Sequence, residues 1–148
     1  MRQCHHQLAV TAPRPGLYEI TRPVVAWVRA TGIDAGLLTL FVRHTSASLL
    51  IHENAAPAAR RDTEAYFARI APEGDGYEHD DEGPDDMPAH LRAALTAVSL
   101  SIPVTQGRPL LGPWQGIHLF EHRRAPHRRD VALHLIGASS HDLLTNFS

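Results

Sequence analysis

The chain has 148 residues, of which 43% are hydrophobic, and its formal net charge is -2. This length and apolar content suit one soluble domain with one core. The charge balance gives no positive field to hold nucleic acid or an anionic membrane without sequence preference. All fourteen basic residues are arginine. The lack of lysine excludes Schiff-base chemistry, pyridoxal-phosphate catalysis and Walker-type ATP hydrolysis, which each need a lysine amine.

Cysteine and histidine usage narrows the cellular location and the kind of metal site. Cys4 is the only cysteine, so an intramolecular disulfide and a thiolate metal cluster are excluded, and a reducing cytoplasm is expected. The first ten residues do not form the apolar run of a signal peptide, and the longest apolar stretch, residues 36–42, is too short to span a bilayer. Eleven histidines therefore favour a metal site of imidazole and carboxylate ligands.

The first third of the chain predicts strands and one short helix. Strands are predicted at residues 8–11, 17–20, 36–45 and 46–53. Thr21 is predicted to cap a helix that ends at Gly32. The third and fourth strands are so apolar that both are expected to be central in a sheet.

Two further helices are predicted on either side of an acidic segment. One begins at Pro57 and ends near residue 72, with an ion pair between Arg60 and Glu64. The other is capped by Asp85 or Asp86 and ends near residue 96. The predicted buried face of the first helix is Thr63, Tyr66, Phe67 and Ile70, and that of the second is Leu91, Ala94 and Leu95.

The last third predicts strands at residues 98–104, 117–122 and 131–136 and a turn at residues 106–107. The final two strands are expected to pair through the polar turn at residues 123–130. The predicted fold class is α+β. We expect one compact domain over residues 1–148, with mostly antiparallel strands in a sandwich-like arrangement and about three helices.

Two pairs of polar residues are candidates for chemistry. Asp86 and His90 are four residues apart on one helical face, so they could share a proton or a cation, or they could be a capping aspartate beside a solvated histidine. Glu121 ends an otherwise apolar strand face. It could escape to solvent at the strand end, or it could close a polar site together with His122.

Other motifs give weaker signals. No Gly-x-Ser-x-Gly elbow is present, and Ala56 stands where the zinc-protease motif needs its second histidine. The eight carboxylates between residues 73 and 86 lack the order of a calcium-binding loop. Arg108 could bind phosphate, whereas the arginines at 123, 124, 128 and 129 are interpreted as a solvated hairpin tip.

Three blocks resemble the YjbQ-type family, also called secondary thiamine-phosphate synthases: HTSASLLIHENAAP at residues 44–57, DDMPAHLRAAL at 85–95 and IPVTQGRPLLGPWQGIHLFEHR at 102–123. The resemblance implies a small α+β fold, a homotrimer, and a polar pocket that often carries a metal. The site residues that it implies are His44, Ser46, Glu53, Asn54, His79, Asp86, His90, Trp114, Gln115, Glu121 and His122. His44, Ser46, Glu53, Asp86 and Glu121 are assigned to catalysis, and Asn54, Arg108, Trp114 and Gln115 to substrate binding.

The reaction implied by the resemblance joins a pyrimidine-methyl pyrophosphate to a thiazole phosphate and releases pyrophosphate. We expect His79, His90 and His122 to converge on one pocket, with at least two of them binding a divalent metal such as Zn, Mg or Mn. The expected partner is a small phosphorylated substrate. A metal-dependent hydrolase of a phosphorylated small molecule and a non-catalytic trimeric ligand-binding protein remain as alternatives.

Overall fold

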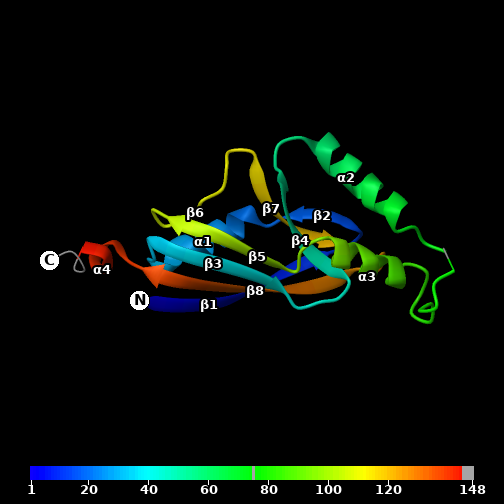
Figure 1. Cartoon of the computed structure of the whole chain (residues 1–148), viewed down its shortest axis with the longest axis horizontal. Helices are drawn as coiled ribbons and strands as arrows, with labels where there is room; N and C mark the ends of the chain where they lie inside the picture. Colours follow the sequence, from blue (N-terminus) through cyan, green and yellow to red (C-terminus); the bar gives the residue numbers. More distant parts are fainter. Residues whose placement is uncertain (75, 145–148) are drawn as a thin grey trace.

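The structure, a computed structural model, describes residues 1–74 and 76–144 and contains two antiparallel sheets. The five-stranded sheet has the order β1-β8-β3-β5-β6 and the three-stranded sheet has the order β2-β7-β4 (Figure 1). The strands are β1 (Arg2–Ala12), β2 (Gly16–Glu19), β3 (Ala35–Val42), β4 (Ala47–Glu53), β5 (Ser99–Thr105), β6 (Arg108–Pro109), β7 (Gln115–Glu121) and β8 (His127–Ala138). The predicted α+β class with antiparallel strands is confirmed.

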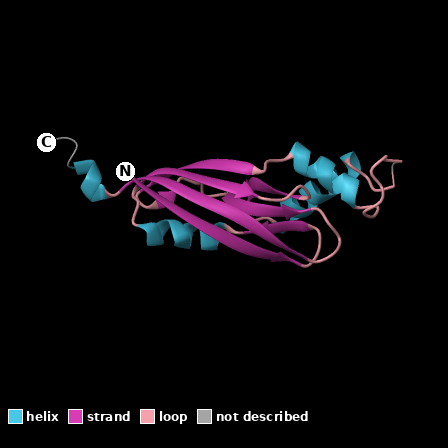
Figure 2. Cartoon of the chain, turned by 90° about the horizontal axis from the view of Figure 1, so that it is seen from below, coloured by secondary structure: helices cyan, strands magenta, loops and turns pink. Residues whose placement is uncertain are grey.

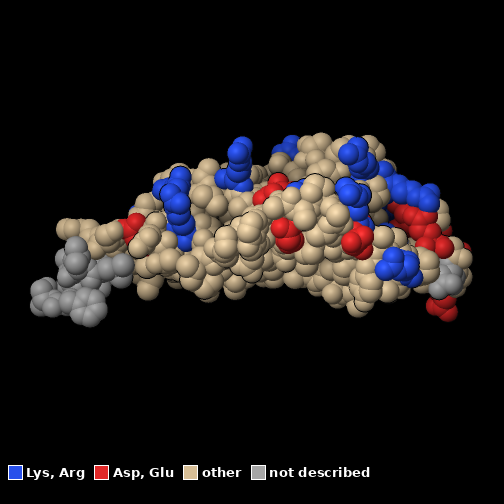
Figure 3. Space-filling model, turned by 90° about the horizontal axis from the view of Figure 1, so that it is seen from above, with Lys and Arg blue, Asp and Glu red and all other residues tan. Residues whose placement is uncertain are grey.

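The helices are α1 (Thr21–Thr31), α2 (Pro57–Ile70), α3 (Asp86–Leu95) and the short α4 (Ser140–Leu144). Figures 1 and 2 show α2 and α3 together at one end of the molecule, with both chain termini at the other end. The acidic segment that joins these two helices gathers negative side chains at the same end in Figure 3. No helix in the described part of the chain is both long enough and apolar enough to span a membrane.

The core lies between the two sheets and along α1. Alternation along β3 turns Leu38 and Leu40 inward, where they are fully buried in one cluster with Ile117 and Leu119 of β7. The opposite face of β3 presents Leu37 and Phe41, which are 43% and 47% exposed. The larger sheet is therefore apolar on both faces along this strand.

Two of the connections that cross between the sheets lie at the end of β4 where that strand begins. Residues 43–46 lead from β3 in the larger sheet to β4 in the smaller one, and residues 122–126 lead from β7 to β8. The backbone N–H of His122 donates to the carbonyl oxygen of Ser46 over 3.3 Å, so the two connections are in contact. The polar groups that follow these strands are thereby brought together.

The structure corrects two predictions about the strands and confirms a third about a turn. The strands at 117–122 and 131–136 do not pair, because β7 joins β2 and β4 whereas β8 joins β1 and β3. β4 lies at the edge of its sheet, although β3 is central as predicted. The turn at residues 106–107 is confirmed: Gln106 and Gly107 have φ values of 51° and 70° and close a two-residue hairpin between β5 and β6.

The helix boundaries agree with prediction more closely than the buried faces do. In α2 no residue is fully buried, and Tyr66 and Ile70 are exposed. In α3 the buried residues are Asp86, Pro88, Ala89 and Ala93, whereas Leu95 is exposed. Thr21 is not a capping residue: its hydroxyl accepts the backbone N–H of Ile117 over 2.9 Å and so ties α1 to β7.

The predicted ion pair in α2 gives way to other partners. The carboxylate of Glu64 accepts the backbone N–H of Leu17 over 3.0 Å, and the Arg60 guanidinium lies 3.5 Å from the carbonyl oxygen of Asn54. These contacts tie α2 to β2 and to the end of β4.

Candidate functional site

A cluster of imidazole and carboxylate groups forms where α3 meets the acidic segment. Asp86 and His90 project from α3, and His79 and Glu82 project from the segment before it. Nε2 of His79 lies 2.7 Å from Oδ2 of Asp86 and 3.0 Å from Oε2 of Glu82, and Nε2 of His90 lies 3.0 Å from the same Asp86 oxygen. One potential ligand atom from each of the four residues lies within 4.8 Å of all the others. We call this set the His79–His90 cluster.

Asp86 is the buried centre of this cluster, with 2% of the residue exposed. Its second oxygen, Oδ1, accepts a hydrogen bond of 2.6 Å from Nη1 of Arg123. Burial alone would raise the pKa of Asp86, but the hydrogen bond to His79 and the charges of His90 and Arg123 outweigh it and hold the pKa below its usual range. Asp86 is therefore an anion at neutral pH.

The orientation of His90 is fixed by a backbone carbonyl. Nδ1 of His90 lies 2.9 Å from the carbonyl oxygen of Thr45, and because a carbonyl can only accept, Nδ1 carries the proton. In the neutral imidazole Nε2 then presents a lone pair to the Asp86 carboxylate 3.0 Å away. Two lone pairs at this distance repel each other unless a proton or a cation lies between them.

A second group of polar side chains lies beside the connections at residues 43–46 and 122–126. Glu121 is fully buried, and its two oxygens each accept a hydrogen bond of 2.5 Å, one from Nε and one from Nη2 of Arg129. Arg129 is 4% exposed, and Nη2 also donates to the hydroxyl of Ser46 over 3.0 Å. The interpretation of Arg129 as part of a solvated hairpin tip is wrong, and Glu121 does not escape to solvent.

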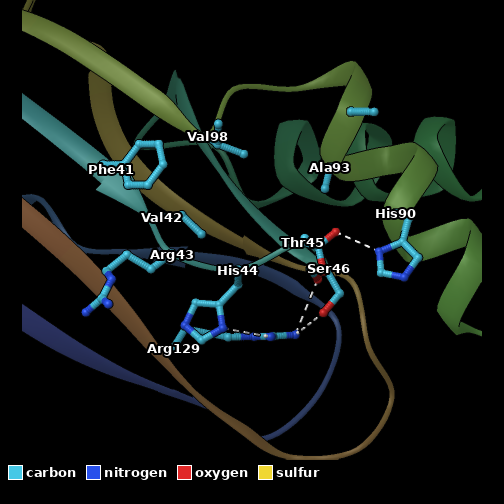
Figure 4. Close-up of a pocket in the computed structure, with 11 residues that line it drawn as sticks. Phe41, Val42, Arg43, His44, Thr45, Ser46, His90, Ala93, Val98 and Arg129 are labelled. Carbon is cyan, nitrogen blue, oxygen red and sulfur yellow. Dashed lines mark hydrogen bonds between the residues drawn. The ribbon is translucent and has the colours of Figure 1, made fainter. Parts of the chain in front are cut away.

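His44 joins the same group and lines an open groove. Its Nε2 accepts the backbone N–H of Asp130 over 2.9 Å, and its Nδ1 lies 3.4 Å from Nη1 of Arg129. Burial, followed by the charge of Arg129, lowers the pKa of His44 below its ordinary value. The groove has a volume of about 1030 Å³ and includes His44, Ser46, His90 and Arg129 among its lining residues (Figure 4). His90 therefore belongs both to the His79–His90 cluster and to the groove.

His122 lies outside the His79–His90 cluster. Its Nε2 shares a hydrogen bond of 2.9 Å with the hydroxyl of Ser48, and its Nδ1 has no partner among the described residues. Burial, together with the charges of Arg92 and Arg129, lowers the pKa of His122 to about 3. We expected His122 to join His79 and His90 as a potential metal ligand, but the cluster contains Glu82 instead.

This low pKa makes His122 a source of acid instability. Below pH ~6.5 the unfolded chain protonates His122 whereas the folded chain does not, so stability falls as the pH decreases toward 3. We expect His122→Gln, which keeps a polar group near Ser48, to flatten the pH dependence by up to about 1.4 kcal/mol per pH unit. Urea unfolding of both proteins from pH 7 to pH 4 measures this difference, and parallel curves would contradict it.

The remaining predicted residues lie toward the opposite end of β4. The amide of Asn54 donates to the carbonyl oxygens of Pro113 and Gln115, and the carboxylate of Glu53 accepts the backbone N–H groups of residues 55 and 56. Trp114 is 67% exposed, and Arg108 is exposed on the hairpin that follows β5. The seven residues of β4 separate this group from Ser46 by roughly 20 Å. One chain therefore does not bring all the predicted residues together.

Three residues of the site were missed in the sequence. Arg129 precedes Val131 and Leu133 in period-two alternation on β8, which places it on the inward face, so the signal was present. Arg123 donates to Asp85, to Asp86 and to the carbonyl oxygen of Glu82, and it thereby joins α3 to the acidic segment. Glu82 had no distinguishing signal among the eight carboxylates of that segment.

Comparisons with known proteins agree on the family. A family model described as UPF0047 protein YjbQ-like matches residues 6–138. The UPF0047 protein sll1880 of Synechocystis is 47% identical over 137 residues, which cover 92% of this chain and 93% of that protein. The UPF0047 protein YjbQ of Salmonella typhimurium is 52% identical over 91 residues, or 62% of this chain and 66% of that protein.

Solved structures show the same fold. The conserved hypothetical protein TT1486 of Thermus thermophilus is 35% identical, with a TM-score of 0.79 over 88% of this chain and 99% of that one. The YbjQ-like protein SSO2532 of Sulfolobus solfataricus, described as of unknown function, has a TM-score of 0.82 at 22% identity, over 92% of this chain and 99% of that one. The chain therefore belongs to the YjbQ/UPF0047 family, a family of unknown function.

Proposed function

We propose that this chain is an enzyme that uses a divalent metal at the His79–His90 cluster to act on a small phosphorylated substrate. The observation that carries the proposal is the orientation of His90, whose Nε2 is directed at the Asp86 carboxylate while Nδ1 donates to the carbonyl oxygen of Thr45. Metal-binding histidines characteristically donate their other ring N–H in this way.

The donor set fits a divalent cation. Two imidazole nitrogens and two carboxylates suit Zn or Mn, and the carboxylates also suit Mg. Two ligand atoms that bind one tetrahedral zinc ion at about 2.0–2.1 Å lie roughly 3.3 Å apart. The contacts of 2.7–3.0 Å within the cluster need a small outward movement to reach that spacing, whereas ligand atoms up to 4.8 Å apart would move closer together.

Each residue of the chain then has a distinct role. Asp86, Glu82, His79 and His90 would hold the cation, which when bound supplies charge to stabilise a leaving pyrophosphate or phosphate. Arg123 positions the Asp86 carboxylate through Oδ1. Phe41 and Val98 give the adjacent groove an apolar wall against which an organic group of the substrate can pack.

The candidate reaction is the synthase reaction implied by the family resemblance. With the pyrimidine pyrophosphate as substrate, we expect pyrophosphate release that needs Mg, Mn or Zn and also depends on the thiazole phosphate. Release without the thiazole partner would support the hydrolase alternative. If the rate of pyrophosphate release with each of these metals equalled the rate in buffer alone, the proposal would be contradicted and a ligand-binding protein would be favoured.

We also propose that the chain works as a homotrimer. The loop between β6 and β7 projects from the molecule in Figure 1, contains no charged residue, and exposes Leu110 and Trp114 by 60% and 67%. The groove lies toward the opposite end of β4, so contact between the loop of one copy and the groove of the next is head-to-tail. Head-to-tail contacts form a ring when the rotation between copies closes, and such a ring would unite the separated site residues. The number of three copies is the one that the family resemblance implies.

The assembly predicts a mass of three chains of 16.3 kDa by light scattering. We expect Trp114→Asp to yield smaller species, because a carboxylate placed in an apolar interface loses its hydration. Ala65→Asp adds the same charge on the exposed side of α2 and serves as the control. A monomer mass for the unmodified chain at all concentrations would contradict the trimer.

A further inference from the structure

Three polar side chains that line the groove lie together in Figure 4. His44 and Ser46 lie on the connection between β3 and β4, and Arg129 approaches them from β8. The Ser46 hydroxyl lies 3.0 Å from Nη2 of Arg129, and Nδ1 of His44 lies 3.4 Å from Nη1. Arg129 is 4% exposed and Ser46 is 8% exposed, so the set belongs to the folded interior at the base of the groove.

The His44 ring, which lines the groove, carries its hydrogen-bond donor on Nδ1. Because Nε2 accepts the backbone N–H of Asp130, the proton of the neutral ring resides on Nδ1. Nδ1 faces Nη1 of Arg129, which is also a donor and therefore cannot accept that proton. His44 thus has an N–H without an acceptor among the described residues.

Ser46 and Arg129 add further donors. The Ser46 oxygen accepts from Nη2 of Arg129, which leaves its own O–H free to donate. Nε and Nη2 of Arg129 are committed to Glu121, whereas Nη1 faces only the His44 ring among the described residues. The Glu121–Arg129 pair is close to neutral overall, so recognition here depends on directed hydrogen bonds more than on net charge.

We propose that His44, Ser46 and Arg129 form a binding site for a phosphoryl oxyanion, with three groups donating to its oxygens. A tetrahedral oxyanion accepts several hydrogen bonds at once, and hydrogen bonds to an ionised acceptor are the strong ones. The organic part of the ligand then lies along Phe41 and Val98, and His90 connects the site to the cluster. The assignment of the ligand as a substrate rests on the proposed function, whereas the donor geometry does not require a metal.

Binding of inorganic phosphate and pyrophosphate in the presence of a chelator tests the site by calorimetry. His44→Gln places an amide near Nε2, where it can still accept from Asp130, but it removes the donor at the Nδ1 position. His44→Asn places an amide N–H near Nδ1. We expect His44→Gln to weaken pyrophosphate binding about tenfold or more, and His44→Asn to retain most of it. Ser46→Ala should weaken binding less, and Ser101→Ala, on the exposed side of β5, should not change it.

The same variants separate this inference from the metal proposal. His44 is not part of the cluster, so His44→Gln should bind Mn or Zn as the unmodified chain does. Saturable pyrophosphate binding that is lost in His44→Gln supports the inference even if no metal binds. Equal pyrophosphate binding by His44→Gln and the unmodified chain, or no saturable binding by either, would overturn it, whatever the metal titration shows.

Discussion

Asp86→Asn is expected to lower the affinity for a divalent metal by at least about 100-fold and to abolish metal-dependent turnover. Among the described carboxylates, only Asp86 contacts both histidines of the cluster, and its oxygen Oδ2 lies 2.7 Å and 3.0 Å from their Nε2 atoms. The amide has one oxygen and no charge, so it cannot replace an anionic ligand. Loss of such a group commonly costs ~10² to 10⁴ in rate.

Asp81→Asn is the matched control for this prediction. Asp81 lies in the same acidic segment and 3.5 Å from Nδ1 of His79, but its side chain is 81% exposed and it is outside the cluster. We expect it to change metal affinity only a few-fold. Competition titration with a coloured chelator measures both variants, and thermal melting shows whether each is folded. Equal metal affinities for Asp86→Asn and the unmodified chain would contradict the assignment.

Arg129→Met is expected to destabilise the fold by about 3–5 kcal/mol, because it leaves the Glu121 carboxylate buried without its partner. For a domain of this size the melting temperature should fall by roughly 10 °C or more. Removal of both charges in Glu121→Gln with Arg129→Met should recover much of the loss, since no unpaired charge then remains.

Arg128→Met provides the control at the neighbouring position. Arg128 is exposed on the other face of β8, and substitutions of this kind change stability by about 0.5 kcal/mol or less. Urea unfolding of the four proteins measures the free energies. The account of a buried ion pair would be wrong if Arg129→Met were as stable as Arg128→Met.

Local patterns predict most of the secondary structure of this chain but not the pairing of its strands. Alternation and glycine positions indicate β7, β8 and the hairpin at residues 106–107, because these signals depend on neighbouring residues. Adjacent strands in the sequence usually pair, which favours a hairpin of β7 with β8. The chain instead crosses from the smaller to the larger sheet at residues 122–126. Which strands pair here depends on packing across the core.

The predicted buried faces of the helices were wrong for a related reason. In α3 a purely apolar criterion selects Leu91, Ala94 and Leu95, whereas the buried side is centred on Asp86, Ala89 and Ala93. Asp86 is buried because Arg123, 37 residues away, supplies a hydrogen bond of 2.6 Å. A buried carboxylate with a distant partner has no local signature in the sequence.

The candidate site could be predicted only in part. The pairing of Asp86 with His90 follows from helical spacing, and the addition of His79 followed from the family resemblance. Arg129 was assigned to solvent because four arginines near one turn favour an exposed tip, although its alternation with Val131 indicated the inward face. The separation of Trp114 from the groove follows from the length of β4, and a sequence motif contains no information about this distance.

Diffraction at the absorption edge of Mn or Zn, from crystals grown with that metal, tests the central claim most directly. The account predicts one strong anomalous peak within about 2.5 Å of ligand atoms of His79, Asp86 and His90, with Glu82 as the fourth ligand. Crystals of Asp86→Asn grown in the same way should lack the peak. A fully occupied metal elsewhere, or a His79–His90 cluster without a peak at saturating metal, would contradict the account.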